Sequence, residues 1–182
     1  MAPHDGAMDT HHDPSLSGER RDLLEALAVH RGFLLHTVRG LTDEQATARP
    51  TVSALCLGGI VKHVAHTEAT WARFVVDGPA AFGAWPPAPE ELARWGDQFT
   101  LLPGESLEAV VARYHEVAAA TDALVRTVDL DLSHPLPPAP WFPPGAVRSA
   151  RRVFVHIVAE TAQHAGHADI LRESIDGTRT MG

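Results

Sequence analysis

Apolar residues recur at the three- and four-residue spacing of an amphipathic helix in four long stretches of the chain. These stretches cover about residues 18–39, 53–76, 106–128 and 147–175. No stretch alternates over a convincing length with the two-residue period of a strand. An amphipathic helix must bury its apolar face against another element, so four long helices predict an all-α fold, a four-helix bundle.

The ends of the helical stretches set the limits of the predicted domain. Ser17 can cap the first helix, and Asp176-Gly177 is a stop signal for the last one. Residues 1–16 lack apolar periodicity and carry Pro, Asp, Gly and Ser, which predicts a disordered N-terminal tail. The sequence therefore predicts a single helical-bundle domain at 17–177, followed by a short C-terminal tail at 178–182.

Two of the predicted connections are long and rich in proline and tryptophan. One follows the second helix, and the other, LSHPLPPAPWFPPG, follows the third helix and contains six prolines. Long irregular connections in a compact domain are more often functional than idle. Their aromatic side chains can either roof a cavity or only cover the open end of the bundle. These residues are Trp85, Trp95, Trp141 and Phe142.

Charge and composition argue against several classes of protein. The formal net charge is −8, and no basic stretch is dense enough to follow a phosphate backbone, which argues against nucleic-acid binding. Charged residues or histidine interrupt every apolar run well before the roughly 18 residues of a membrane span. The N-terminus has no apolar segment of the signal-peptide kind. The single cysteine, Cys56, fits a reducing cytoplasm and is expected in the core.

The last predicted helix contains the segment ETAQHAGHADILRE, which begins at Glu160 and carries side chains that can bind metal. Glu160 and His164 lie about 40° and one turn apart on a helix, so both can point at one atom. His156, one turn before Glu160, and His167, about one turn after His164, lie on the same side of the predicted helix. A glutamate and a histidine at this spacing can also form a surface pair. An ionised glutamate on a partly apolar side instead favours a compensating metal ion.

The second predicted helix contains a further pair of histidines in GGIVKHVAHTEATW. His63 and His66 are three residues apart, so periodicity alone leaves open which of them faces the interior. One of them, together with Glu160 and His164, would supply two imidazoles and one carboxylate. Such a set leaves a fourth tetrahedral position open, as in catalytic zinc sites. Zinc is therefore the expected divalent metal, with iron(II) and nickel as alternatives.

The segments LGGIVKHVA and ETAQHAGHADILRE resemble those of the DinB-like superfamily of four-helix bundles, which includes the mycothiol-dependent maleylpyruvate isomerases. The similarity extends over about residues 20–175. In that superfamily, one histidine of the second helix and two residues one turn apart on the last helix hold a metal ion. The resemblance implies that the ligands here are His63, Glu160 and His164. Three further histidines are expected to line the cavity or to contact a metal-binding side chain: His66, His156 and His167.

The resemblance also implies a reaction. A low-molecular-weight thiol of the mycothiol type would attack an electrophile in an S-transfer or an isomerisation, so the implied partners are small molecules. A bound divalent metal also lowers the pKa of water, which makes a metal-dependent hydrolase an alternative. A non-enzymatic metal-binding or stress-response protein is a second alternative. A helical scaffold or dimerisation module is a third. A second copy of the chain, bound through a bundle face, is a further candidate partner.

Three arginines near the start of the last helix are candidates for binding an anionic cosubstrate. Arg148, Arg151 and Arg152 lie at the positive end of the helix dipole, a mildly unfavourable place that suggests an anionic partner. The alternative interpretation is a solvated cationic cluster. Together with Trp141, these arginines are the predicted substrate-binding residues.

Overall fold

The structure is a computed structural model that describes residues 15–180. Within these residues it contains six α-helices, two short 3₁₀ segments and one small sheet. The helices are α1 (Gly18–Val38), α2 (Asp43–Thr47), α3 (Leu57–Asp77), α4 (Pro89–Gly96), α5 (Leu107–Thr127) and α6 (Ala150–Asp176). The remaining elements are η2 (Gly78–Phe82), η3 (Asp97–Phe99), β1 (Ser133–Pro135) and β2 (Val147–Ser149).

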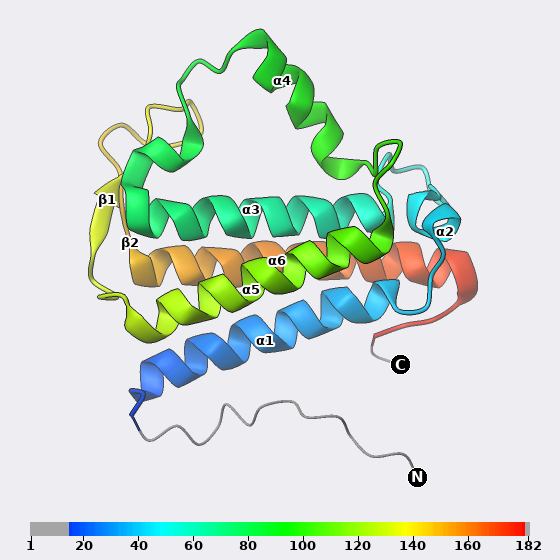
Figure 1. The fold of residues 1–182 in the computed structure, drawn as a ribbon, viewed down its shortest axis with the longest axis horizontal. Helices are drawn as coiled ribbons and strands as arrows, with labels where there is room; N and C mark the ends of the chain where they lie inside the picture. Colours follow the sequence, from blue (N-terminus) through cyan, green and yellow to red (C-terminus); the bar gives the residue numbers. More distant parts are fainter. Residues whose placement is uncertain (1–14, 181–182) are drawn as a thin grey trace.

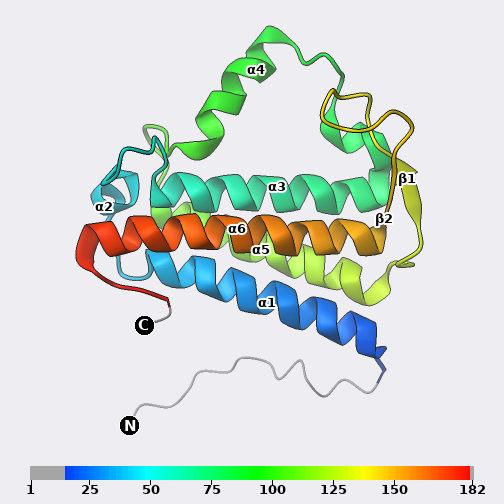
Figure 2. The same cartoon turned by 180° about the vertical axis from the view of Figure 1, so that it is seen from behind.

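The four long helices α1, α3, α5 and α6 lie side by side and form a bundle (Figures 1 and 2). α1 packs mainly against α6, whereas α3 packs against both α5 and α6. The short helix α2 contacts α3. α4 stands off from the bundle as an arch over α3 (Figure 1). The all-α fold predicted from the sequence is therefore confirmed.

The bounds of α1 and α5 are close to those predicted, because side chains satisfy backbone groups at the helix starts. The Ser17 hydroxyl accepts a hydrogen bond from the Arg20 amide, and the Ser106 hydroxyl accepts one from the Ala109 amide. At the end of α6, Gly177 has a φ of 77°, in the left-handed region that favours glycine. No helix in the described part of the chain qualifies as a membrane span.

α3 begins at Leu57, whereas the sequence pattern predicts a start near Ser53. The residues before it form a turn in which side chains bond the backbone. The Ser53 amide donates to Thr51 Oγ1 at 3.2 Å, and the Leu55 amide donates to Ser53 Oγ at 3.2 Å. Local bonds of this kind compete with the helix for the same amides. Cys56 then occupies the N-cap position and is buried, as expected of a core residue.

α6 also begins later than predicted, at Ala150 rather than Val147. The residues in between form β2, which pairs antiparallel with β1 in the register Ser133↔Ser149 and Pro135↔Val147. The pattern could not reveal this ladder because each strand has only three residues. The ladder joins the proline-rich connection to the start of α6 and fixes the backbone of the segment that carries Arg148.

The bundle core consists of two apolar clusters separated by a polar layer. One cluster includes Leu34, Ala65, Tyr114 and Ala165, and the other includes Leu27, Trp71, Val125 and Ile157. Each long helix contributes residues to both clusters, and one buried polar residue lies between the two contributions. These residues are Arg31 in α1, Glu68 in α3, Thr121 in α5 and Thr161 in α6.

An ion-pair network holds the polar layer together. The Arg31 guanidinium donates to Glu68 through Nη2 at 2.5 Å and through Nε at 3.2 Å. Its Nη1 donates to Asp122 on α5 at 2.7 Å. The side chains of Arg31 and Glu68 are only 7% and 1% exposed, so this pair is shielded from water. The pair links α1 to α3 across the middle of the bundle.

The two predicted tails lie at the limits of the description. An N-terminal tail was predicted for residues 1–16, and residues 1–14 of it lie outside the described part of the chain. At the other end, the predicted tail at 178–182 is described up to Thr180, whose amide donates to Asp169 Oδ1 at 2.8 Å. The first residues after α6 therefore fold back onto that helix.

Candidate metal centre

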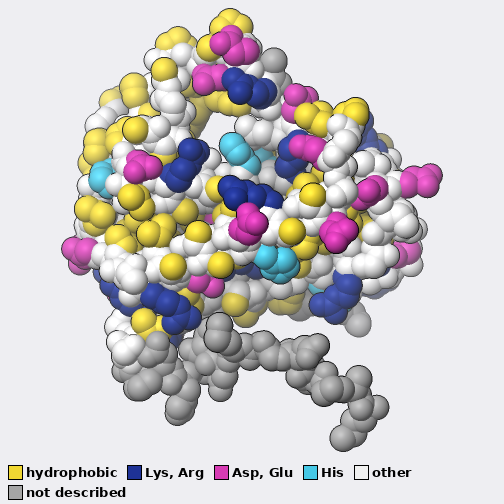
Figure 3. Space-filling view, in the orientation of Figure 1, with side chains coloured by type: hydrophobic (Ala, Val, Ile, Leu, Met, Phe, Trp, Pro, Cys, Tyr) yellow, Lys and Arg dark blue, Asp and Glu magenta, His cyan; other side chains and the backbone are white. Residues whose placement is uncertain are grey.

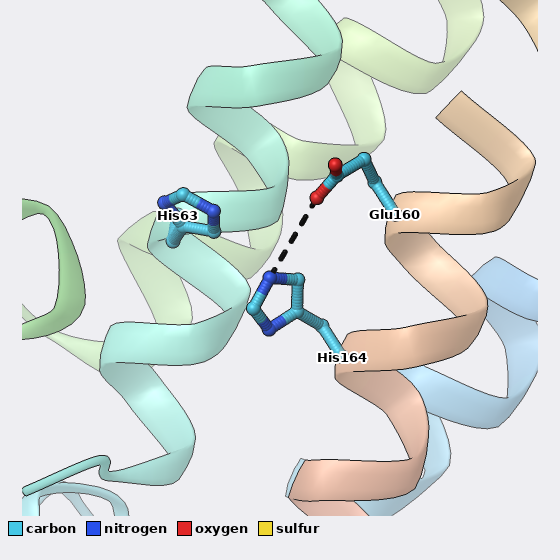
Figure 4. Close-up of side chains that lie close together, drawn as sticks. All are labelled: His63, Glu160 and His164. Atoms are coloured by element: carbon cyan, nitrogen blue, oxygen red, sulfur yellow. Dashed lines mark ion pairs between the residues drawn. The ribbon is translucent and has the colours of Figure 1, made fainter. Parts of the chain in front are cut away.

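One histidine of α3 and two side chains of α6 converge where these helices meet (Figure 4). His63, Glu160 and His164 each offer a ligand atom, and these three atoms lie within 4.8 Å of one another. The His164 Nε2 is 3.8 Å from one Glu160 oxygen. This separation is too long for a hydrogen bond, but it suits donor atoms that share one ion at about 2.0–2.2 Å each. In residues 15–180, no other set of histidine, cysteine and acidic residues forms such a group.

The His63 ring is fixed between two other rings. It stacks on Phe99, with the ring centroids 3.9 Å apart, and it meets the edge of His164 at 4.9 Å. Thr67 Oγ1 lies 3.4 Å from the His63 Nε2, one turn further along α3. These contacts limit the rotation of the imidazole, so the ring is oriented before any ligand binds.

Phe99 reaches His63 because the first turn of α3 contains two glycines, Gly58 and Gly59. A Cβ atom added at Gly59 would lie 1.9 Å from the Phe99 carbonyl oxygen, so only glycine lets the η3 backbone approach the helix this closely. Lys62 strengthens the contact by donating to the Thr100 carbonyl at 3.1 Å. Phe99 was not predicted from the sequence, because it is an isolated aromatic residue in an irregular segment. The GG pair before VKH was the available signal of a close backbone approach.

Gly59→Ala is expected to destabilise the protein by about 1–3 kcal/mol, because the new methyl group overlaps a carbonyl that cannot rotate away. It should also weaken metal binding, since Phe99 must move away from the His63 ring. Urea unfolding and metal titration measure the two effects. Gly166→Ala on α6 is the control, because its added Cβ meets nothing within 4 Å. Equal stability and equal metal affinity of the two variants would contradict the proposed role of Gly59.

Both imidazoles of the cluster are neutral near pH 7. Burial, followed by the neighbouring His164 ring, lowers the pKa of His63 to about 4, although the Gln98 side chain opposes this shift. Burial and the His167 ring lower the pKa of His164. Metal ligation requires unprotonated imidazole, so these shifts remove competition from protons. The His164 Nδ1 is also buried without a hydrogen-bond partner among residues 15–180. Two neutral imidazoles and one carboxylate are a donor set that suits a divalent ion.

His156 contacts the same carboxylate from the other side. Its Nε2 lies 3.6 Å from the second Glu160 oxygen, and its ring meets the edge of Trp71 at a centroid distance of 4.7 Å. Burial, followed by the charges of Arg148 and Arg152, lowers the pKa of His156 to about 4, so this ring is neutral as well. The structure thus places Glu160 between His156 and His164.

Two of the predicted histidines are exposed and do not belong to the group of three. His66 is exposed and lines a cavity of about 620 Å³ together with Lys62 and Arg113. The space-filling view shows the molecule hollowed beneath α4 (Figure 3). None of the three clustered residues lines this cavity. His167 is exposed too, with its ring centroid 5.5 Å from that of His164. The structure therefore brings His63, and not His66, to the α6 pair.

The predicted substrate-binding residues have different surroundings. Arg151 is paired with Glu19 of α1 and Asp131, which occupies its guanidinium away from the cluster. Arg152 is exposed. Trp141 is 56% exposed and packs edge-on against Trp85 at a centroid distance of 4.8 Å. The charge of Arg148 acts on His156, and Glu160 acts on Arg148 in turn.

Comparisons with known proteins identify a family and a similar fold. The family model of the mycothiol S-transferases matches residues 22–177. A crystal structure of a conserved protein from Enterococcus faecalis is similar in fold, with a TM-score of 0.61 and 15% sequence identity. That similarity covers 87% of this chain and 97% of the other. No protein of curated function matches the chain. Because the family match spans all four bundle helices and the cluster between α3 and α6, the chain belongs to the mycothiol S-transferase family, a DinB-like family.

Proposed function

We propose that the protein is a metal-dependent S-transferase that uses a low-molecular-weight thiol of the mycothiol type. The observation that carries this proposal is the convergence of His63, Glu160 and His164 to within 4.8 Å from two helices. Three protein donors leave one position of a tetrahedral site open for the thiol. Membership of the mycothiol S-transferase family supports the choice of thiol chemistry.

Each residue of the cluster has a defined electrostatic part in this proposal. The neutral imidazoles of His63 and His164 add no charge, and Glu160 adds one negative charge, so a centre with a divalent ion carries about +1. A divalent ion supplies a lowered thiol pKa, which makes the nucleophilic thiolate available near pH 7. The neutral ring of His156 lies 3.6 Å from the second Glu160 oxygen, where it adds no charge to the centre.

At the electrophilic carbon, the proposed reaction forms one bond and breaks one bond. The thiol proton passes to solvent, and a sulfur lone pair forms the bond to the electrophilic carbon. The leaving group departs with the electron pair of the bond that breaks. We propose zinc as the metal, because two nitrogens and one carboxylate oxygen with an open position are typical of catalytic zinc; iron(II) and nickel are the alternatives. A free thiol cosubstrate requires a reducing compartment, so we place the protein in the cytoplasm.

Cobalt(II) substitution tests the proposal. The cobalt-loaded protein should change its visible absorption when mycothiol is added, and less or not at all with glutathione or bacillithiol. The zinc-loaded protein should then form the S-conjugate of mycothiol with monobromobimane faster than the solution without protein. His164→Ala should abolish both effects.

Three other results would contradict the proposal in distinct ways. A cobalt spectrum that no thiol changes would indicate a non-enzymatic metal-binding protein. Ester cleavage that needs the metal and no thiol would indicate a hydrolase. Absence of any metal binding would indicate a helical scaffold.

A further inference from the structure

Arg148 lies in an aromatic setting beside the metal cluster. It belongs to β2, directly before α6, and its guanidinium carbon lies 4.7 Å from the centroid of the Trp71 ring. Phe142 lies on the proline-rich connection, and the centroid of its ring is 5.5 Å from the same guanidinium carbon. A guanidinium held over aromatic faces keeps its charge and loses freedom of orientation. Arg148 is therefore a positioned cation and differs from a flexible surface arginine.

Part of this positioned cation has no partner in the protein. The Arg148 Nη1 is buried, and no hydrogen-bond acceptor reaches it from residues 15–180. Burial lowers the pKa of Arg148, followed by the charge of Arg152, while Glu160 acts in the opposite direction. Leaving a charged donor buried and unpaired costs free energy, so such groups call for an explanation. Arg151, three residues further on, has two acidic partners and needs no such explanation.

A continuous set of contacts connects Arg148 to the metal cluster. Trp71 contacts Arg148 through its ring face and His156 at a ring-centroid distance of 4.7 Å. His156 in turn lies 3.6 Å from Glu160. Arg148 and the cluster thus lie along the same junction of α3 and α6, so one small molecule could contact both. The Trp71 and Phe142 rings would flank such a molecule with apolar surface.

We propose that Arg148 is the binding site for a carboxylate of the small molecule that reacts at the metal cluster. The unpaired Nη1 donates to a carboxylate oxygen, and the Trp71 and Phe142 rings beside the guanidinium hold it in place for this contact. The inference rests on the proposed function in one respect only. The proposed reaction has two small molecules, and the carboxylate belongs either to the electrophile or to the thiol. Carboxylate binding itself requires no turnover.

Succinate is a suitable probe, with the uncharged succinamide as its counterpart. Titration calorimetry on the full-length, zinc-loaded protein should show that succinate binds and that succinamide does not. Arg148→Gln should weaken succinate binding about tenfold or more, because a charge-assisted hydrogen bond is lost. Arg151→Gln is the matched control and should bind succinate like the unaltered protein. Zinc content and helical circular dichroism of each variant verify that the cluster and the fold are intact.

Two results would overturn the inference. One is the absence of succinate binding to the unaltered protein, and the other is equal affinity of the unaltered protein and Arg148→Gln. Either result leaves the proposed function standing if mycothiol conjugation proceeds. Conversely, a protein without transferase activity still supports the inference if succinate binding depends on Arg148.

The source of the carboxylate follows from kinetics with matched substrates. If the electrophile brings it, Arg148→Gln raises the KM of a carboxylate-bearing electrophile about tenfold and leaves that of its methyl ester unchanged. If the thiol brings it, the KM of a carboxylate-bearing thiol rises instead. If Arg148→Gln raises the KM of neither the carboxylate-bearing electrophile nor the carboxylate-bearing thiol, the link between Arg148 and the reacting molecule is overturned.

Discussion

His164→Ala is expected to lower the metal content of the purified protein from about one divalent ion per chain to nearly none. Removing a residue that only supports a metal ligand typically costs about 10–100-fold in metal affinity, so removing a ligand should cost more than about 100-fold. The remaining donors, His63 and Glu160, would be two neighbours of an ion that needs at least three protein ligands to stay bound during purification. Glu160→Ala should have the same effect.

Elemental analysis of protein purified without a histidine tag measures the loss, and a competition titration with a metal-binding dye gives the change in affinity. The chain offers two control histidines, since both His66 and His167 are exposed near the cluster. His66→Ala and His167→Ala should keep the full metal content. Retention of metal by His164→Ala, or a larger loss in His66→Ala than in His63→Ala, would show that the ligand assignment is wrong.

Helical spacing was sufficient to predict the half of the candidate centre that lies on one helix. Glu160 and His164 are one turn apart, so any helix through them places both on one side, whatever the rest of the fold does. The apolar pattern was equally informative about the bundle, because each long helix has to bury one face. Predictions of this kind depend on residues close together in the chain, and they need no knowledge of tertiary contacts.

The contribution of α3 could not be predicted in this way. His63 and His66 are equally compatible with the helical pattern, and only the packing of α3 against α6 on one side and α5 on the other distinguishes them. The Phe99 ring that stacks on His63 comes from the segment after α4, whose path the sequence pattern does not specify. The resemblance to the DinB-like superfamily, and not periodicity, pointed to His63.

The buried ion pair could not be predicted from the apolar pattern either. Arg31 and Glu68 each occupy an interior position of their helices, where the periodic signal comes from apolar neighbours such as Leu27 and Trp71. A single charged residue on such a face can lie at the surface edge as easily as in the core. Only the meeting of α1 and α3 shows that the two charges neutralise each other.

Glu68→Ala should therefore lower the free energy of unfolding by about 3–5 kcal/mol, the largest stability effect we expect in this protein. The substitution leaves the Arg31 guanidinium buried and removes two of its hydrogen bonds. Asp122 remains at 2.7 Å, but its side chain is 35% exposed, so it only partly compensates the charge. Urea denaturation followed by circular dichroism measures the change.

The matched control is Glu116→Ala, because the partner side chains in the Arg113–Glu116 pair are 66% and 69% exposed. An exposed pair contributes about 0–1 kcal/mol, so this variant should be nearly as stable as the unaltered protein. Arg31→Met combined with Glu68→Leu should regain most of the lost stability, since apolar residues can replace a buried ion pair. A Glu68→Ala variant no less stable than Glu116→Ala would contradict the shielded ion pair. If the double variant is stable but binds metal more weakly, the Arg31–Glu68 pair also positions α3, the helix that carries His63.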